Sequence, residues 1–455
     1  MSRSSFLEQA AEFLAAADAD EATFAAAREA FIDYIGVALA GSQEQVARTV
    51  FGWAAARSSG REASVIGSRD RLDSEHAALC NGVAGHALDF DDTSWTTIGH
   101  PTTVVAPAAL AIGESIEASG REVVVAYLAG VEVAHRLADL TMPEASQNGW
   151  HTTGIFYALG AAAAACRLLH LERHVTINAL ALSLSRASGI RANFGTQAKP
   201  YHAGMAARNG LEAVSLARAG LTAATEAVEG ADGFIRCFAG AAQHERARLE
   251  RLEFGRPYDL VQRGLAYKRY PCCSGSHPAC DLLLDIVSKH GIDPEQVAEI
   301  RVGTSLLAER ELVCHEPRTP VEARFSMEFA LAVILVRGEV TLESFTADIL
   351  ADPMVRQMMA RVRMTVSPRL AALGFVGTAP VEMEILLRDG RRITGSRDLA
   401  IGNPECPMSE ADRQRKFLAC AGRSITPGAA ADLYQQLLKI DGIASVARLA
   451  ALMHA

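Results

Sequence analysis

The chain has 455 residues, of which 49% are hydrophobic, 21% charged and 6% aromatic. This is the composition of a globular protein with room for two or more domains and a large core. The formal net charge is -9, so no general basic field would attract a nucleic acid or an anionic membrane surface. We therefore expect neither kind of partner.

The ends and the cysteines indicate a soluble, cytoplasmic protein. The N-terminal residues lead directly into an alanine-rich amphipathic pattern, without the apolar segment of a signal peptide. The longest weakly apolar run, residues 155–166, is shorter than the roughly 20 residues that a membrane span needs. Nine cysteines, an odd number, are more typical of reduced thiols than of a disulfide framework.

The first half of the chain predicts a succession of helices, because apolar residues recur at spacings of three and four. These predicted helices span residues 21–39, 77–88, 104–118, 122–140, 152–169, 175–188 and 202–221. One short β-like piece, residues 63–67, interrupts them.

From residue 265 the pattern becomes mixed. Extended or strand-like patterns occupy residues 266–271, 297–302, 362–366 and 381–387, and helical patterns occupy residues 280–290 and 325–337. Asp389-Gly390 predicts a hairpin turn after the last strand. Helical patterns return after Met408, and Pro427-Gly428 is interpreted as a break between them.

We therefore predict a mainly α protein with two domains. A large all-α domain covers residues 1–263 and is completed by C-terminal helices at residues 403–455. A smaller α+β domain covers residues 264–402. Because functional clefts commonly lie between domains, we expect the site there.

The densest group of ionisable residues lies between two apolar helical patterns. His86, Asp89, Asp91 and Asp92 are followed by Thr93 and then by His100. Burying so many ionisable groups requires that they be paired or that their pKa values move, which is typical of acid/base sites. Of the three aspartates we expect only Asp89 to take part in chemistry, and one of the others to hold the local backbone.

Two further segments place basic side chains at predicted helix starts. The positive end of the helix dipole would lower the pKa of His151 and favour a neutral, base-competent imidazole; the alternative is a polar cap or a buried core histidine. Lys199 and His202 would make an anion site, and the alternative is a solvated loop.

Cationic residues near the start of the second domain are interpreted as carboxylate ligands. They are Lys268 and His277, joined further along the chain by Arg324, which together with Ser326 either caps the next helix or faces the cleft. Cys272, Cys273 and Cys280 lack the spacing of a zinc knuckle, so we predict no metal site.

No phosphate-binding loop, dinucleotide fingerprint, zincin or nucleophile-elbow motif occurs in the sequence. What remains is cofactor-free acid/base chemistry on a small anionic molecule.

Five segments together, in this order, resemble the MmgE/PrpD family. They are residues 86–101, 150–154, 195–210, 268–271 and 322–326. The resemblance implies a large all-α domain, a smaller α+β lid domain, a homodimer and a metal-free active site at the domain interface.

The resemblance implies that Asp89, Thr93, His100, His151, Lys199 and His277 are active-site positions, and the sequence itself adds further candidates. The catalytic residues are Asp89, Thr93, His100, His151 and Lys199, and the substrate-binding residues are His86, His202, Lys268, His277 and Arg324. His151 is our first choice for the general base and His100 or Asp89 for the acid, while Thr93 orients a carboxylate or water. The cations neutralise the substrate.

Two departures from the family pattern bear on the substrate. No tyrosine occurs between Tyr270 and Tyr434, although decarboxylase-like members have one shortly before the segment at 322–326. This makes decarboxylation of cis-aconitate less favoured, unless His315 replaces the tyrosine as proton donor. Residues 94–99 shape the substrate end of the pocket.

The predicted function is a cofactor-free lyase, either a dehydratase or a decarboxylase, of a di- or tricarboxylate such as 2-methylcitrate or cis-aconitate. An epimerase of an iminodisuccinate-like dicarboxylate uses the same proton abstraction and is one alternative. A non-catalytic polycarboxylate-binding protein is another.

Overall fold

A computed structural model describes residues 4–374 and 377–454. The chain forms two compact units. The helical unit takes in the described residues of Met1–Ala192, Lys199–Leu265 and Glu410–Ala455, and the mixed unit takes in those of Asn193–Ala198 and Ala266–Ser409. Helices far outnumber strands, which confirms the prediction of a mainly α protein.

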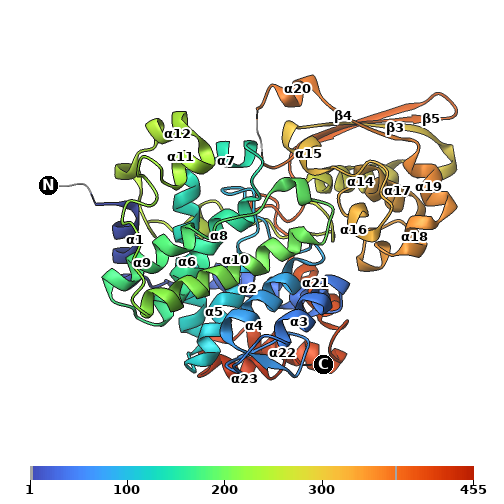
Figure 1. Ribbon diagram of the computed structural model, residues 1–455. Coiled ribbons are helices and arrows are strands. Elements are labelled where there is room, and N and C mark those ends of the chain that lie inside the picture. Colours follow the sequence, from blue (N-terminus) through green and yellow to red (C-terminus); the bar gives the residue numbers. More distant parts are fainter. Residues whose placement is uncertain (1–3, 375–376, 455) are drawn as a thin grey trace. The chain divides into compact units, whose positions relative to one another are not determined.

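The helical unit contains sixteen α-helices and one two-stranded ribbon in its described residues. Most of these helices are labelled in Figure 1. The helices are α1 (Phe6–Ala16), α2 (Glu21–Gly41), α3 (Gln45–Ala55), α4 (Ser74–His86), α5 (Thr102–Ser115), α6 (Gly120–Asp139), α7 (Glu144–Gln147), α8 (Thr152–Leu168), α9 (Arg173–Leu184), α10 (Ala198–Arg218), α11 (Phe234–Ala239), α12 (Ala241–Arg246), α13 (Asp259–Gln262), α21 (Glu410–Ala421), α22 (Pro427–Leu437) and α23 (Val446–Ala450). The ribbon pairs β1 (Ala63–Ser64) with β2 (Arg71–Leu72).

The C-terminal helices return to the N-terminal ones. Helices α21 and α22, red in Figure 1, lie against α2, and α23 lies against α5. Within the described residues, no helix combines the length and the apolar character that crossing a membrane requires.

The core of the helical unit is built on small residues. Helices α6 and α8 pack closely where Gly130 faces Gly160: a Cβ at Gly130 would lie 2.4 Å from the carbonyl oxygen of Gly160 and 2.9 Å from Val105. The alanine-rich sequence of α8 is buried along almost its whole length. Small side chains therefore set the distance between the helices that carry the site.

The mixed unit contains a four-stranded sheet in the order β4-β3-β5-β6. Its strands are β3 (Val297–Thr304), β4 (Val362–Val366), β5 (Val381–Leu387) and β6 (Arg392–Arg397). Strand β3 runs parallel to β4 and antiparallel to β5, and β5 and β6 form the hairpin predicted from Asp389-Gly390.

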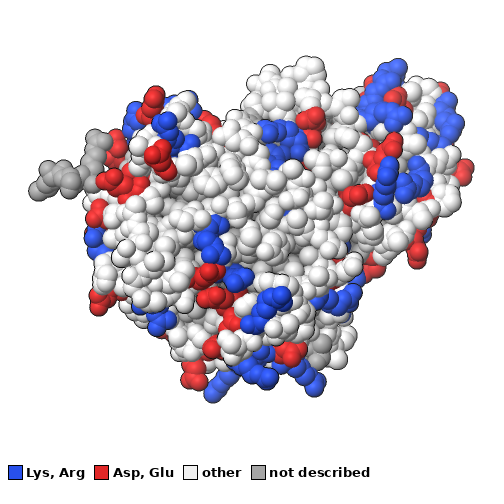
Figure 2. All heavy atoms as spheres, in the orientation of Figure 1, with Lys and Arg blue, Asp and Glu red and all other residues white. Residues whose placement is uncertain are grey.

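Seven helices accompany this sheet among the described residues. They are α14 (His277–His290), α15 (Leu306–Glu311), α16 (Pro320–Ala323), α17 (Met327–Arg337), α18 (Ala347–Ala351), α19 (Pro353–Met359) and α20 (Pro368–Ala371). Helix α14 lies against β5 and β6, and α17 lies against β4. Side chains of both charges are interspersed on the face drawn in Figure 2.

The break expected at Pro427-Gly428 separates α21 from α22. Pro427 itself begins α22, where Thr426 caps the first turn; proline suits this position because its missing N–H would be unpaired there anyway. Residues 266–271, which we expect to be extended, lie outside the helices and strands, and the N–H of Tyr267 donates to the carbonyl oxygen of Gly402.

We expect Gly130→Ala to destabilise the protein by about 1–3 kcal/mol, the usual range for overpacking a tight core. The matched control is Gly52→Ala, since a Cβ at Gly52 meets nothing within 4 Å and alanine stabilises an open helical position by up to about 1 kcal/mol. Thermal unfolding of both variants tests this, and equal melting temperatures would contradict the packing argument.

Candidate active site

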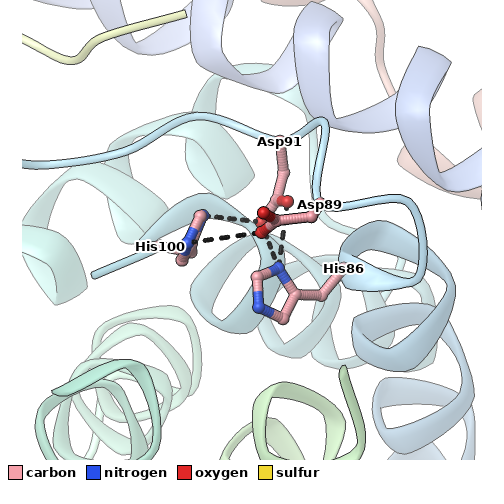
Figure 3. Close-up of side chains that lie close together, drawn as sticks. All are labelled: His86, Asp89, Asp91 and His100. Atoms are coloured by element: carbon pink, nitrogen blue, oxygen red, sulfur yellow. Dashed lines mark hydrogen bonds and ion pairs between the residues drawn. The ribbon is translucent and has the colours of Figure 1, made fainter. Parts of the chain in front are cut away.

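A sharp turn after α4 brings an imidazole and a carboxylate together. The helix ends at His86, and Asp89 then adopts a φ of 51°, a conformation that non-glycine residues seldom take. The chain returns so that both carboxylate oxygens of Asp91 lie 2.9–3.0 Å from Nδ1 of His86 (Figure 3). Both side chains are fully buried.

Asp91 also faces His100, whose Nδ1 lies 3.3 Å from a carboxylate oxygen of Asp91. Burial alone would raise the pKa of Asp91, but His86 and His100 lower it overall. Burial lowers the pKa of His86 to about 3, against the opposing effect of Asp91. The pair is therefore an ionised carboxylate that accepts a hydrogen bond from the Nδ1–H of a neutral imidazole.

This arrangement leaves Nε2 of His86 as the basic nitrogen of the ring. That atom is buried and has no hydrogen-bond partner. The ring centroid of His86 lies 4.4 Å from that of His100 and 6.1 Å from that of His151. Three imidazoles thus share one buried region.

Lys199 supplies the positive charge of the cluster. It lies in the first turn of α10, is 4% exposed, and its ammonium lies 2.5 Å from Oδ1 of Asp89. Nε2 of His100 lies 3.8 Å from the same oxygen. Lys199 also lowers the pKa of His86 and of His151, which places all of these groups within electrostatic reach of one another.

His151 is the residue immediately before α8, as predicted. Its Nδ1 lies 3.0 Å from Nδ1 of His202, and its pKa is well below the usual value, first because of burial and then because of Lys199. The predicted direction holds, although burial rather than the helix dipole is the main cause. The pKa of His202 is lowered for the same two reasons.

A second layer of contacts fixes the turn from behind. Lys416 of α21 donates to the carbonyl oxygen of Phe90 at 2.9 Å and pairs with Asp33 at 2.6 Å. Asp92 accepts a hydrogen bond from the hydroxyl of Thr102, and burial raises its pKa well above the usual value. Asp92 therefore holds the start of α5. This is the role that we expect for one of Asp91 and Asp92.

The structure distributes the predicted residues over both units. Seven lie in the helical unit, all of them buried: His86, Asp89, Thr93, His100, His151, Lys199 and His202. Lys268, His277 and Arg324 are buried within the mixed unit. Nε2 of His277 lies 3.1 Å from the carbonyl oxygen of Cys272, and it is Ser326, not Arg324, that caps α17.

Sequence reasoning missed the part that Asp91, Lys416 and Asp33 play. Asp91 was set aside, yet it orients two histidines. Lys416 lies 326 residues from Phe90, so no local pattern could have paired them.

Four side chains have the geometry to hold a metal ion. The ligating atoms of His86, Asp89, Asp91 and His100 lie within 4.8 Å of one another, the one such group among the described residues. Two imidazoles and two carboxylates suit zinc. However, the ammonium of Lys199 lies against Asp89, so a divalent ion would have to overcome a fixed positive charge.

Two family models match the chain. The MmgE/PrpD N-terminal domain matches residues 8–247, and the MmgE/PrpD C-terminal domain matches residues 270–439. The first match takes in the cluster described above, and the second takes in His277 and Arg324, while Lys268 lies between the two matched ranges.

The similar curated proteins include cis-aconitate decarboxylases of animals and a fungus. The Mus musculus enzyme is 29% identical over 428 residues, covering 90% of this chain and 85% of that protein. The Homo sapiens enzyme is 28% identical, with the same coverage. The Aspergillus terreus enzyme is 25% identical over 409 residues, covering 86% of this chain and 83% of that protein.

The buried neutral histidines predict instability in acid. Their pKa values in the folded state lie below the value of about 6.5 in the unfolded state. Below that pH the unfolded chain therefore binds more protons than the folded protein, and acid favours unfolding. Each such group then costs up to about 1.4 kcal/mol per pH unit. We expect the melting temperature to fall steeply from pH 7 to pH 5, and less steeply in His151→Gln. In the control His174→Gln, whose side chain is 73% exposed, the slope should stay as in the wild type; a flat wild-type profile would contradict the assignment.

Removing the fixed charge should open the cluster to metal. We expect Lys199→Met to bind Zn²⁺ at least about tenfold more tightly than the wild type, because a charge about 4 Å away is worth roughly 4 kcal/mol at an effective dielectric constant of 20. Isothermal titration of both proteins measures this. The exposed residue Lys289 provides the control Lys289→Met. Equal Zn²⁺ affinities in all three proteins would show that the charge of Lys199 does not oppose metal binding.

Proposed function

Because this chain belongs to the MmgE/PrpD family, we propose that it is a lyase that removes water or carbon dioxide from a small di- or tricarboxylate by cofactor-free acid/base catalysis. The observation that carries the proposal is one buried cation, Lys199, among neutral imidazoles. A polycarboxylate needs the cation for binding, and the chemistry needs the bases. Since the similar proteins are cis-aconitate decarboxylases, cis-aconitate is the first substrate to test.

In the proposed mechanism His151 removes a proton from the carbon next to a substrate carboxylate. Negative charge then builds on that carboxylate as an enolate-like state forms. Lys199 stabilises this charge more in the transition state than in the ground state. At about 4 Å and an effective dielectric constant of 20 the pairing is worth roughly 4 kcal/mol before desolvation is subtracted.

The second proton transfer is assigned to His100 or Asp89. In a dehydration the acid protonates the departing hydroxyl group, which leaves as water. In a decarboxylation no proton is removed from carbon beforehand: the carbon–carbon bond breaks, carbon dioxide leaves with the electron pair staying on carbon, and the acid protonates the resulting carbanion. No tyrosine occurs between Tyr270 and Tyr434, and His315, which pairs with Glu328 at 2.9 Å, is an alternative donor.

The proposal assigns the remaining predicted residues to substrate binding. Thr93 orients a carboxylate or a water by hydrogen bonding. The side chains of His202, Lys268, His277 and Arg324 bind the substrate's carboxylates, and Nε2 of His86 accepts a hydrogen bond from a hydroxyl group of the substrate or from a water. The proposal also includes a homodimer and a cytoplasmic location.

Two alternatives remain part of the proposal. His86, His151 and His202 all have lowered pKa values, and two neutral imidazoles facing opposite sides of one carbon would give an epimerase. A binding protein without turnover would need the cations but no bases, which makes it the weaker alternative.

We expect the wild type to turn over at least one of methylcitrate, cis-aconitate, citrate and iminodisuccinate. His151→Ala should lower kcat by about 10²–10⁴-fold, the usual contribution of a general base. Lys199→Ala should lower kcat/KM by about 10²–10³-fold, as loss of one electrostatic donor does. Product formation is followed by chromatography and carbon dioxide release.

The matched controls are His174→Ala and Lys289→Ala, which change exposed residues of the same types. They should leave activity unchanged. Full activity in His151→Ala and Lys199→Ala would contradict the roles, and thermal stabilisation by a polycarboxylate without any product would favour the binding protein.

A further inference from the structure

The loop between Thr93 and His100 is closed on itself. The N–H of Ser94 donates to the carbonyl oxygen of Gly99 at 2.8 Å, and the N–H of Gly99 donates back to Ser94 at 3.3 Å. The two ends of the loop are therefore neighbours. Their position determines the positions of the adjoining residues Thr93 and His100.

One residue of this loop is in a strained conformation. Ile98 has a φ of 50°, which is unfavourable for a β-branched residue and costs about 1–3 kcal/mol. Such a conformation persists only where the surroundings impose it. The hydroxyl of Thr152 donates to the carbonyl oxygen of Ile98 at 2.6 Å, and the N–H of His100 donates to Thr153 at 3.1 Å.

Behind the loop lies a buried network made of Thr97, Tyr157, His135 and Asp259. The hydroxyls of Thr97 and Tyr157 are 2.7 Å apart, and the Tyr157 hydroxyl is 2.9 Å from Nε2 of His135. Nδ1 of His135 is 2.5 Å from Oδ2 of Asp259. All four residues are fully buried. The network spans α6, α8 and α13 and ends on the loop.

The network ends on an ionised carboxylate. Burial would raise the pKa of Asp259, but His135 and Arg263 lower it overall, so the carboxylate is ionised and accepts. It accepts from Nδ1 of His135 and from the hydroxyl of Thr96, which lies 2.8 Å away. The hydroxyl of Tyr157 pairs with Nε2 of His135 and with the hydroxyl of Thr97, so it joins the imidazole to the loop.

Burying this network costs free energy. Apolar side chains of the same volume would avoid the cost of burying a carboxylate and an imidazole. A connected set of buried hydrogen bonds holds the group at its end in a single orientation. Here that group is the loop at residues 94–99.

We propose that Tyr157, His135 and Asp259 are positioning residues, which hold residues 94–99 and so fix Thr93 and His100 relative to His151 at the start of α8. The kinetic part of this inference rests on the proposed function, whereas the structural part does not. None of the three residues is assigned contact with the substrate.

The test removes the bond between the network and the loop from either side. Tyr157→Phe and Thr97→Val should each lower kcat by about 10–100-fold, since a misplacement of about 1 Å can cost 10²-fold, with a smaller change in KM. The double variant should be no less active than the less active of the two single variants, because the bond that Thr97→Val removes is already absent in Tyr157→Phe. Independent, multiplying effects would overturn the proposal.

The matched control is Tyr258→Phe, which removes a phenol that donates to the carbonyl oxygen of Asp18 at 2.7 Å and does not reach the loop. It should lose similar thermal stability and keep its kcat. An equal loss of kcat in Tyr258→Phe would mean that the effect is general destabilisation and would overturn the proposal.

Hydrogen–deuterium exchange of the backbone at residues 94–100 provides a readout that needs no substrate. Exchange should accelerate in Tyr157→Phe and Thr97→Val but not in Tyr258→Phe. If the wild type turns over no polycarboxylate, the proposed function fails while the exchange data still decide on the network. Unchanged exchange in both variants would overturn it, and if Tyr157→Phe does not fold, Thr97→Val decides.

Discussion

The buried ion pair between Lys199 and Asp89 is the interaction on which the cluster depends. A buried ion pair gains little over an apolar packing of the same volume, because desolvation offsets most of the attraction. It also acts on its neighbours: burial and, after it, this fixed positive charge keep the pKa of His151 low. The arrangement therefore combines a buried cation with an imidazole that is already neutral.

The backbone around this charge is organised by three helix termini. α4 ends at His86, α8 begins after His151, and α10 carries Lys199 in its first turn. Small residues let these helices approach closely: a Cβ at Gly82 of α4 would lie 2.7 Å from Gly204 of α10. Packing of the helical core thus sets the distances within the cluster.

The sequence predicted well what local patterns determine. Helical periodicity located the helices of the first half, the alternation at residues 381–387 located β5, and Asp389-Gly390 located its hairpin. The start of α8 at His151 followed from the same patterns. The partners of Asp91 did not, because a contact made through a turn with a positive φ at Asp89 leaves no periodic trace. Pro427-Gly428 located the break between α21 and α22, and Pro427 is the first residue of the second helix.

The long-range contacts divide the work of holding the site. Lys416 fixes the turn at Phe90 from α21, and the network ending at Asp259 fixes the loop before His100 from α13. Neither group need contact a substrate to matter, because an error in the position of an acid or a base is costly even when its pKa is right. A cluster of ionisable groups in the sequence is thus only half of an active site. The other half is the set of distant side chains that hold the backbone in place. They prevent the ionisable groups from moving to pair with one another.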